Sequence, residues 1–319
     1  MSEGELFGTS PTGGAESQSS EALNAAPKVG RTTKSSARSR TNVLPRPLRN
    51  AKFVTGALGI SIVTIVAIFG TRLSPNDPLK ITPELRLANP SWAHPFGADE
   101  LGRDLMARVF QGARVSMLVG VLSVAFAVTA GTTLGITAGY FGGFIDDLIM
   151  RVMDVIFAFP TILLALTIVA VLGAGITNII IAISIVSTPA FTRIARGSTL
   201  AVKSELYLQA AIAMGAGHFR IMTATILPNI TAPLIVVASL ALPGAILAEA
   251  GLSFLGLGHP LPNATWGQLL NSSRDNMGAA PWLVIAPGAS LMMTVMAFSL
   301  FGDAVRDIAD PRLRAEARR

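Results

Sequence analysis

Six apolar runs set the strongest constraint on what this chain can fold into. Each is long enough to cross about 30 Å of hydrocarbon as a helix. They cover residues 53–71, 115–138, 152–173, 176–192, 226–248 and 282–302. The composition agrees, because 51% of the 319 residues are hydrophobic and only 14% are charged, a balance too apolar for an ordinary soluble domain. We therefore predict an all-α polytopic membrane protein with six transmembrane helices.

The apolar runs divide the chain into four parts. Residues 1–45 are rich in Gly, Ser, Thr, Ala and Pro, which predicts a disordered tail because such a segment cannot bury enough apolar surface to offset its chain entropy. Residues 46–114 hold the first transmembrane helix and a long loop, and residues 115–305 hold the five remaining helices. A polar insertion at 193–228 interrupts that core, and residues 306–319 form a second tail.

The distribution of lysine and arginine predicts which segments face the cytoplasm. If both termini are inside, most of the 25 basic residues fall in the inner segments, as the positive-inside rule requires. The net charge of +6 then reflects orientation in a membrane, and we expect no nucleic-acid partner. The same orientation makes both tails cytoplasmic and places the insertion at 193–228 in the cytoplasm.

The long loop before the second run predicts a further helix at the membrane surface. In the stretch GADELGRDLMARVFQGARVSM, apolar residues recur at helical spacing and charged residues fall opposite them. The apolar set is Leu101, Leu105, Met106, Val109, Phe110 and Ala113, and the charged set is Arg103, Asp104 and Arg108. We expect an interfacial helix that leads into the second span. A solvated connector is the alternative.

Small residues in the second run predict close helix packing. Gly131, Gly135 and Gly139 recur every four residues. Such a face lets two helices approach closely in a membrane, where packing rather than hydrophobicity drives association. Packing within this chain is the favoured interpretation for each of these glycines.

The sequence contains no recognisable catalytic, cofactor or metal site. Cysteine is absent, and neither the phosphate-binding loop G-x-x-x-x-G-K-[ST] nor an HExxH motif occurs. Ser253 lies near glycines, but no histidine lies at a matching depth to activate it. We therefore expect a non-enzymatic chain that holds no cofactor and no metal of its own.

Charged residues in the apolar runs argue against an ion-coupled carrier, whose mechanism needs ionisable groups at mid-span. Arg151 and Asp154 lie three residues apart at the inner end of the third run, where we expect a structural i, i+3 ion pair. Glu249 falls near the outer end of the fifth run. A carrier that acts alone is therefore the less favoured alternative.

The insertion combines a short helix, a glycine turn and a second helix. Residues 203–214, KSELYLQAAIAM, predict about three helical turns. The stretch GAG at 215–217 then ends or sharply turns that helix, because glycine tolerates the left-handed conformation, and Leu227-Pro228 opens the next span. A short helix with small side chains is suited to docking into a groove on another protein. Packing against the chain's own helices is equally compatible with the pattern.

The spacing in this insertion resembles the EAA loop of ABC-importer permeases. That motif reads E-A-A, three residues, G, nine residues, I-x-L-P. The matching positions are Gln209, Ala210, Ala211, Gly215, Leu227 and Pro228. The sequence departs from the motif twice, because Gln209 replaces the leading glutamate and Thr225 occupies the isoleucine position. The first departure removes a charge that could pair with an arginine of a partner.

The likeness extends over about residues 85–314. Six further stretches are similar to the dipeptide/oligopeptide/nickel permease family, specifically to its second, C-type, subunit. They are HPFGADELGRDLMARVFQGARVSM, AGYFGGFIDDLIMRVMDVIFAFP, EAGLSFLGLG, TWGQLL, APWLVIAPG and FGDAVRDIADPRLR. Taken together these stretches are specific to that family, although a single one such as GDAVRD would be a weak signal.

The resemblance implies a multi-pass permease of a bacterial inner membrane, embedded in lipid, that serves an ATP-driven importer. Such a subunit pairs with a homologous second permease and docks two cytoplasmic ABC ATPase subunits, which bind ATP and Mg. An extracytoplasmic solute-binding protein delivers the substrate. Peptides are the implied substrate, and nickel, glutathione or another small solute are alternatives.

The family's functional positions carry over to the insertion. Coupling to the ATPase is implied for Gln209, Ala210, Ala211 and Gly215. The hinge is implied for Gly217, Leu227 and Pro228. By this reading, movement of the docked helix tilts the fifth span.

Overall fold

The computed structural model describes residues 51–258 and 264–309, and this part of the chain is helical. The α-helices are α1 (Ala51–Leu73), α2 (Leu105–Phe141), α3 (Gly143–Phe157), α4 (Thr161–Leu172), α5 (Ile176–Lys203), α6 (Leu206–Ala213), α7 (His218–Arg220), α8 (Leu227–Leu252), α9 (Trp266–Ser272) and α10 (Trp282–Ala309). Short 3-10 segments are η2 (Pro83–Leu85) and η5 (Arg274–Asn276), and π-helical segments are η3 (Ile221–Ile226) and η4 (Ser253–Leu257). The tail predicted at 1–45 and most of the tail at 306–319 lie outside the described residues.

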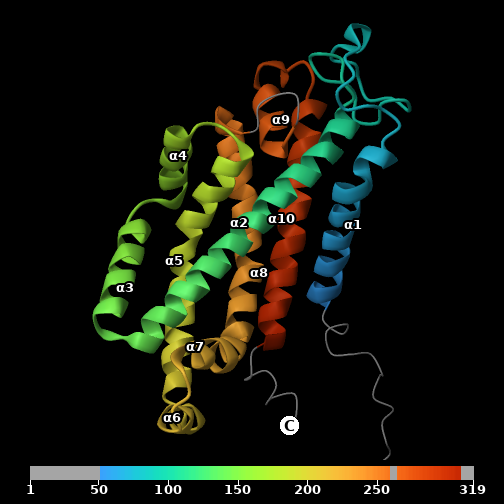
Figure 1. The fold of residues 1–319 in the computed structure, drawn as a ribbon. Coiled ribbons are helices and arrows are strands. Elements are labelled where there is room, and N and C mark those ends of the chain that lie inside the picture. The colour runs from blue at the N-terminus through green and yellow to red at the C-terminus, as the bar shows by residue number, and fades with distance from the viewer. Residues whose placement is uncertain (1–50, 259–263, 310–319) are drawn as a thin grey trace, which may run out of the picture. The chain divides into compact units, whose positions relative to one another are not determined.

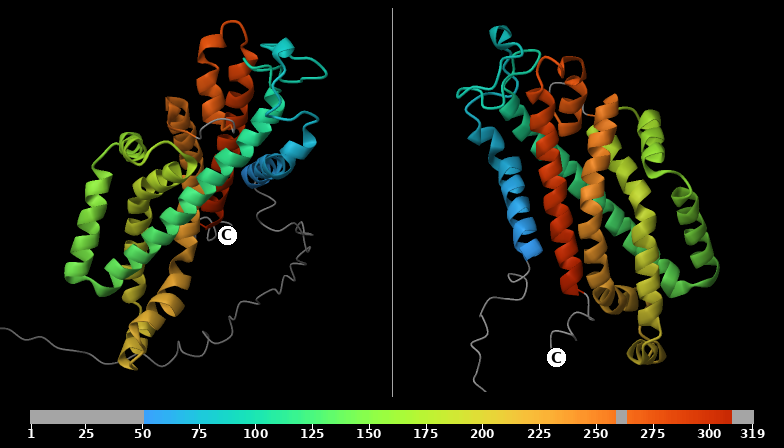
Figure 2. Two further views of the ribbon diagram at one scale, coloured as in Figure 1. Left: turned by 45° about the horizontal axis from the view of Figure 1, so that its top comes forward. Right: turned by 180° about the vertical axis from the view of Figure 1, so that it is seen from behind.

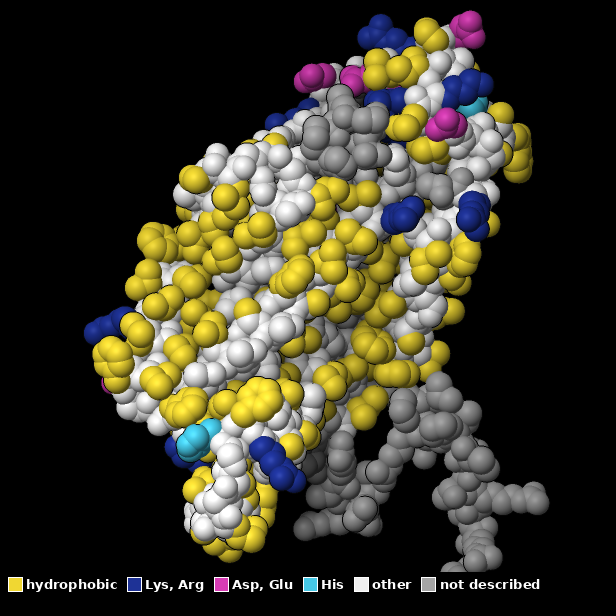
Figure 3. All heavy atoms as spheres, viewed as in Figure 1, with side chains coloured by type: hydrophobic (Ala, Val, Ile, Leu, Met, Phe, Trp, Pro, Cys, Tyr) yellow, Lys and Arg dark blue, Asp and Glu magenta, His cyan; other side chains and the backbone are white. Residues whose placement is uncertain are grey.

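Five helical stretches of the described part are long and apolar enough to cross a membrane. They are Ala51–Gly70, Leu105–Phe141, Ile176–Lys203, His218–Leu257 and Trp282–Ala309. They pack into one bundle, which α2 crosses obliquely (Figure 1), and the view from behind shows the same arrangement (Figure 2). Hydrophobic side chains cover the middle of the face in Figure 3, and charged side chains gather toward its two ends. The predicted all-α polytopic membrane fold is therefore confirmed.

The predicted third span, residues 152–173, has a different form. It is divided between α3 and α4, which meet at an angle of 93°. The break falls at Phe159 and Pro160, because proline has no N–H to donate and its ring disfavours helical backbone at the preceding residue. The prediction of one helix here is wrong, and a sixth crossing results only if the bent pair counts as one span.

The most extensive helix–helix contact among the described residues joins α2 to α5. Gly131, Gly135 and Gly139 all face α5. A Cβ atom at Gly135 would lie 2.5 Å from both the Ala195 Cβ and the Thr192 carbonyl oxygen, closer than real Cβ atoms approach. The glycine stripe predicted from the sequence therefore packs within the chain and sets the distance between the two helices.

Helix α1 joins the bundle through a similar close approach. It packs against α10 and α2, and Gly56 lies on the backbone of Phe301, where a Cβ atom would come within 2.6 Å of the nitrogen. Helix α10 in turn packs on α8, and α8 packs on α2. The crossing helices are thus connected to one another by direct contacts.

The segment before the second span differs from the predicted interfacial helix. Helix α2 begins at Leu105 and continues without a break to Phe141, so the amphipathic stretch forms its first turns. The apolar side chains Leu105 and Val109 share a buried cluster with Trp266 instead of facing lipid. The charged side chains are buried as well, rather than directed to water: Arg103, Asp104 and Arg108.

Asp99, Arg103 and Asp104 pair with one another or with the preceding loop, whereas Arg108 lies beside Asp99 and keeps buried nitrogens without a hydrogen-bond partner among the described residues. Asp99 accepts a hydrogen bond from Arg103 Nε at 2.7 Å and lies 3.5 Å from Arg108 Nε. Asp104 caps α2 by accepting a backbone N–H at 2.7 Å, and its second oxygen lies 2.7 Å from His94 Nδ1. Because these charges are paired, burial is tolerated. A sequence pattern that assigns charges to the solvent side therefore fails at this position.

Two ion pairs attach α3 to α5. Asp146 accepts two hydrogen bonds from Arg196, from Nε at 2.5 Å and from Nη2 at 2.6 Å. Asp154 accepts one from Arg193 Nη2 at 2.7 Å. The expected pair between Arg151 and Asp154 is therefore corrected: α5 lies alongside α3 and supplies Arg193, while Arg151 is exposed.

Replacing Gly135 with alanine should destabilise the bundle by about 1–3 kcal/mol, because the added methyl group overpacks the contact between α2 and α5. Gly244→Ala is the matched control, since this glycine lies inside α8 and a Cβ atom there meets open space. Thermal unfolding in detergent should show a lower Tm for Gly135→Ala and an unchanged or higher Tm for Gly244→Ala. Equal Tm values for the two variants would contradict the close-packing account.

Two adjacent aspartates should respond differently to neutralisation. Asp146→Asn should lower the free energy of unfolding by about 1–2 kcal/mol, because it weakens a charge-assisted, two-point contact with Arg196 that is partly screened by solvent. Asp147→Asn should change it little, because that side chain is exposed. Denaturant unfolding of both variants checks this. A larger loss in Asp147→Asn would show that α3 is oriented differently.

Candidate functional site

Helix α6 projects from one end of the bundle, on the loop that joins α5 to α7 (Figure 1). Leu208 is fully buried and anchors α6 to the main hydrophobic core. Exposed side chains run along another side of the helix at the spacing i, i+3, i+4 and i+7. They are Leu206, Gln209, Ala210 and Ala213, and we call them the α6 face.

The side chains at the centre of the α6 face project only a short distance from the helix. Ala210 and Ala213 carry only methyl groups, and Gln209 folds back so that its Nε2 donates to the Ser204 carbonyl oxygen at 3.3 Å. Ala211, the third residue of the family motif, is half-buried and lies off this face. Small side chains allow close approach of another protein's surface, as helix-in-groove recognition requires.

Gly215 ends α6 through a specific backbone geometry. Its φ of +80° lies in the left-handed region that other residues rarely adopt. The Gly215 N–H donates to the Ile212 carbonyl at 2.9 Å, and the Ala216 N–H donates to the Ala211 carbonyl at 3.1 Å. This is the Schellman motif, which satisfies carbonyls that a helix end leaves unpaired. The requirement for glycine is conformational, because a Cβ atom there meets nothing within 4 Å.

The residues assigned to the hinge have regular backbone in this conformation. Gly217 has a φ of −65°, which any residue adopts. Leu227 and Pro228 lie inside a continuous helical stretch from His218 to Leu257. The irregular backbone falls just before them, in the π-helical η3, because a proline perturbs the turn that precedes it. π-helical turns are rare and occur often at functional sites. The assignment of the hinge to Gly217, Leu227 and Pro228 stays a prediction, and η3 lies between the first two of these residues.

A groove opens beside η3. It has a volume of about 440 Å³ and lies between α2, η3 and α8. Threonines make up much of its lining: Thr129, Thr132, Thr133, Thr137, Thr223 and Thr231. Phe219 and Met222, which follow α6 and its glycine turn, belong to the same lining. The groove is therefore adjacent to the segment that connects α6 to the bundle.

Two buried polar side chains pair with each other at the other end of the bundle. Ser253 donates its hydroxyl to Glu249 Oε1 at 2.7 Å, and both side chains are buried. Within residues 51–258 and 264–309, no three metal-ligating side chains gather in one place.

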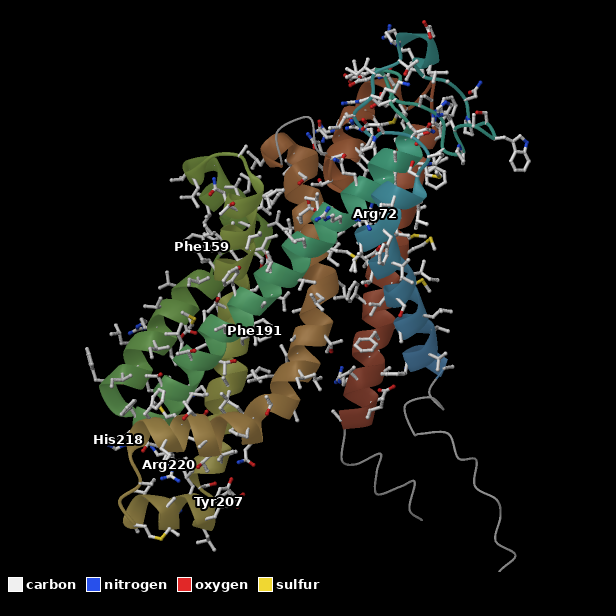
Figure 4. All side chains as sticks on the ribbon, turned by 45° about the vertical axis from the view of Figure 1, so that its right-hand side comes forward. Arg72, Phe159, Phe191, Tyr207, His218 and Arg220 are labelled. Carbon is white, nitrogen blue, oxygen red and sulfur yellow. The ribbon has the colours of Figure 1, made fainter. Side chains whose placement is uncertain are left out.

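Tyr140 lies at the α6 end of the bundle, and the sequence patterns above do not single it out. Lys203, the last residue of α5, donates from Nζ to the Tyr140 carbonyl oxygen at 2.7 Å. His218, the first residue of α7, places Nδ1 2.7 Å from Tyr140 Oη. Figure 4 shows His218 and Arg220, the two ends of α7, together with Tyr207 on α6. These contacts join residues 63 and 78 positions apart, which no local spacing reveals. The one signal available is a tyrosine in AGYFGG, just before the glycines that end α2.

Comparison with known proteins identifies relatives of nearly equal length. A dipeptide transport system permease protein, DppC, of Alkalihalophilus pseudofirmus is 43% identical over 267 residues, which cover 84% of this chain and 88% of the relative. The glutathione transport system permease protein GsiD of Pectobacterium atrosepticum is 41% identical over 85% of this chain and 90% of its own. The di/tripeptide transport system permease protein DppC of Pseudomonas aeruginosa is 40% identical over 86% of this chain and 95% of its own.

A structural comparison and a family model agree with the similarity to these relatives. One chain of the MetNI methionine ABC transporter, solved in an inward-facing conformation, superposes with a TM-score of 0.53 at 17% identity, covering 65% of this chain and 98% of that one. At that identity the likeness shows the fold alone. The family described as binding-protein-dependent transport system inner membrane component matches residues 131–315. The resemblance to permeases of the dipeptide family of ABC importers is thereby confirmed, and this chain belongs to the binding-protein-dependent transport system inner membrane components.

Proposed function

We propose that this chain is the permease subunit of an ATP-driven importer of peptides, and that it forms half of a translocation path with a homologous second permease. The α6 face carries the proposal: an exposed helix with small side chains, ended by the left-handed Gly215, projects from a membrane bundle. Relatives named for dipeptide and di/tripeptide transport support peptides as the substrate. Catalysis is left to other subunits.

In this proposal the α6 face lies in the cytoplasm of a bacterium, and both termini lie on that side of the inner membrane. Basic side chains near this end support the orientation: Arg193, Arg196, Lys203 and Arg220. At the opposite end, which bears α9 (Figure 1), acidic side chains are interspersed with basic ones. That end receives substrate from an extracytoplasmic solute-binding protein.

Two ABC ATPase subunits, which bind ATP and Mg, dock beneath the two permeases, one of them on the α6 face. Movement of α6 reaches η3 because the Schellman turn and α7 connect them over a few residues. Since Phe219 of α7 and residues of η3 line the threonine-rich groove, the groove changes shape when α6 moves. The ATPases shift this equilibrium only by as much as they bind its two states differently.

Glutathione is a second candidate substrate, favoured by the 41% identity to a glutathione permease. It is itself a small peptide, so it belongs to the same chemical class. Nickel or another small solute fits the same architecture without a specific feature of this chain in its favour. An ion-coupled carrier that acts alone leaves the α6 face without a role.

Reconstitution tests the proposal. Proteoliposomes that contain this chain, its sister permease, both ATPases and the binding protein should import a labelled dipeptide or tripeptide only when ATP is supplied to the α6 side. Glutathione and Ni²⁺, offered separately in the same vesicles, distinguish the alternative substrates. Uptake by this chain alone, driven by an ion gradient, would refute the proposal.

Two glycines near α6 should differ in their effect on coupling. Gly215→Val should uncouple ATP hydrolysis from uptake while membrane insertion is retained, because a β-branched residue opposes the left-handed backbone that ends α6. Gly197→Ala is the control, since this glycine lies inside α5 and a Cβ atom there meets open space. Peptide imported per ATP hydrolysed should fall severalfold in the first variant and stay constant in the second. Unchanged coupling in Gly215→Val would show that the turn is dispensable.

A further inference from the structure

The two ends of the α6 loop, residues 203–218, converge on one residue of α2. The chain leaves α5 at Lys203, makes the excursion that carries α6, and returns at His218. Both of these residues contact Tyr140, which lies in the last turn of α2. The base of the α6 loop is therefore fixed at a single place on a helix that is far away in sequence.

On the departing side, the contact is with the backbone. Lys203 Nζ donates to the Tyr140 carbonyl oxygen at 2.7 Å and lies 5.9 Å from the centroid of the Tyr140 ring. Carbonyls in the last turn of a helix lack intrahelical partners and carry partial negative charge. Lys203 thus ties the end of α5 to the end of α2, and this tie does not involve the tyrosine hydroxyl.

On the returning side, the contact is with the side chain. Tyr140 Oη lies 2.7 Å from His218 Nδ1, and the two rings meet edge to face with centroids 5.6 Å apart. Phe141 adds a second ring 5.9 Å from His218. Tyr140 is only 6% exposed, so surrounding residues hold its ring and fix the direction of its hydroxyl. The start of α7 is thereby held against α2.

Helix α6 has few other attachments. Leu208 is its one buried side chain, and the rest are half-buried or exposed. The angle at which the α6 face meets a partner, and the direction in which it passes on a displacement, therefore depend on how the base of the loop is held.

We propose that Tyr140 is a positioning residue for coupling: its hydrogen bond to His218 holds the pivot through which a displacement of α6 reaches η3. The inference rests on the proposed function, because it needs a partner on the α6 face. Without the hydroxyl, the start of α7 is no longer held against α2 and shifts when α6 is displaced. The ATPase subunits then still hydrolyse ATP, but less of their motion reaches the groove beside η3.

Tyr140→Phe tests this role, because it removes the hydroxyl and keeps both the ring and the carbonyl that Lys203 contacts. In proteoliposomes with the complete importer, the peptide imported per ATP hydrolysed should fall roughly fivefold, the scale of one lost hydrogen bond. The Tm and the amount of ATPase that co-purifies should stay the same. A purely structural role would instead lower the Tm or the co-purification and leave the ratio unchanged.

Variants at His218 provide a second test. His218→Asn keeps a hydrogen-bonding group near the position of Nδ1 and should retain most of the coupling. His218→Leu removes it and should reproduce the defect of Tyr140→Phe. An equal loss in both variants, or no loss in either, would overturn the role of the hydrogen bond.

A cross-link separates failure of this inference from failure of the proposed function. The chain has no cysteine, so Ala210→Cys gives a single attachment point on the α6 face for a photoreactive maleimide. Cross-linking to an ATPase subunit, combined with an unchanged ratio in Tyr140→Phe, would overturn the role of Tyr140 alone. If no cross-link forms in the assembled importer, no partner docks on the α6 face, and both proposals are overturned.

Discussion

The close approach of α2 and α5 determines the geometry of the end of the molecule that bears α6. Because Gly131, Gly135 and Gly139 have no Cβ, the two backbones lie nearer than any other side chain permits. That approach brings the end of α5 within reach of the end of α2, so that Lys203 can bond the Tyr140 carbonyl. A packing contact in the membrane thus sets where a loop outside the membrane begins and ends.

The same arrangement explains how α6 can be both exposed and ordered. Ion pairs hold α3 on α5, and the buried Leu208 holds α6 on the core. Other apolar side chains here are open to solvent: Leu206 is 81% exposed, and Met214, which caps the end of α6, is 82% exposed. Exposed apolar side chains on an ordered element are typical of an interaction surface, which agrees with a partner on this helix.

The sequence predicted the features that depend on local pattern. Apolar runs located the crossing helices, the glycine spacing located the stripe on α2, and GAG marked the end of α6. Each of these follows from backbone preference or helical periodicity, which neighbouring residues decide. Even the error at α3 and α4 had a local signal, since Pro160 stands within the predicted run.

What the sequence could not predict depends on residues distant in the chain. Arg108 was assigned to the solvent side, and only the fold supplies the Asp99 that makes its burial tolerable. Asp154 was paired with its nearest basic neighbour, Arg151, because Arg193 comes 39 residues later. Tyr140 had no predicted role at all, since its significance arises from two segments that meet it in space.

The length of α2 has a consequence for how the two ends of the protein communicate. Its 37 residues make a single rod about 55 Å long, well beyond the hydrocarbon thickness of about 30 Å. One tip holds the buried charges around Asp104, and the other presents Tyr140. A rigid rod keeps its length when it tilts, so any tilt of α2 about a point inside the bundle moves its two tips in opposite directions.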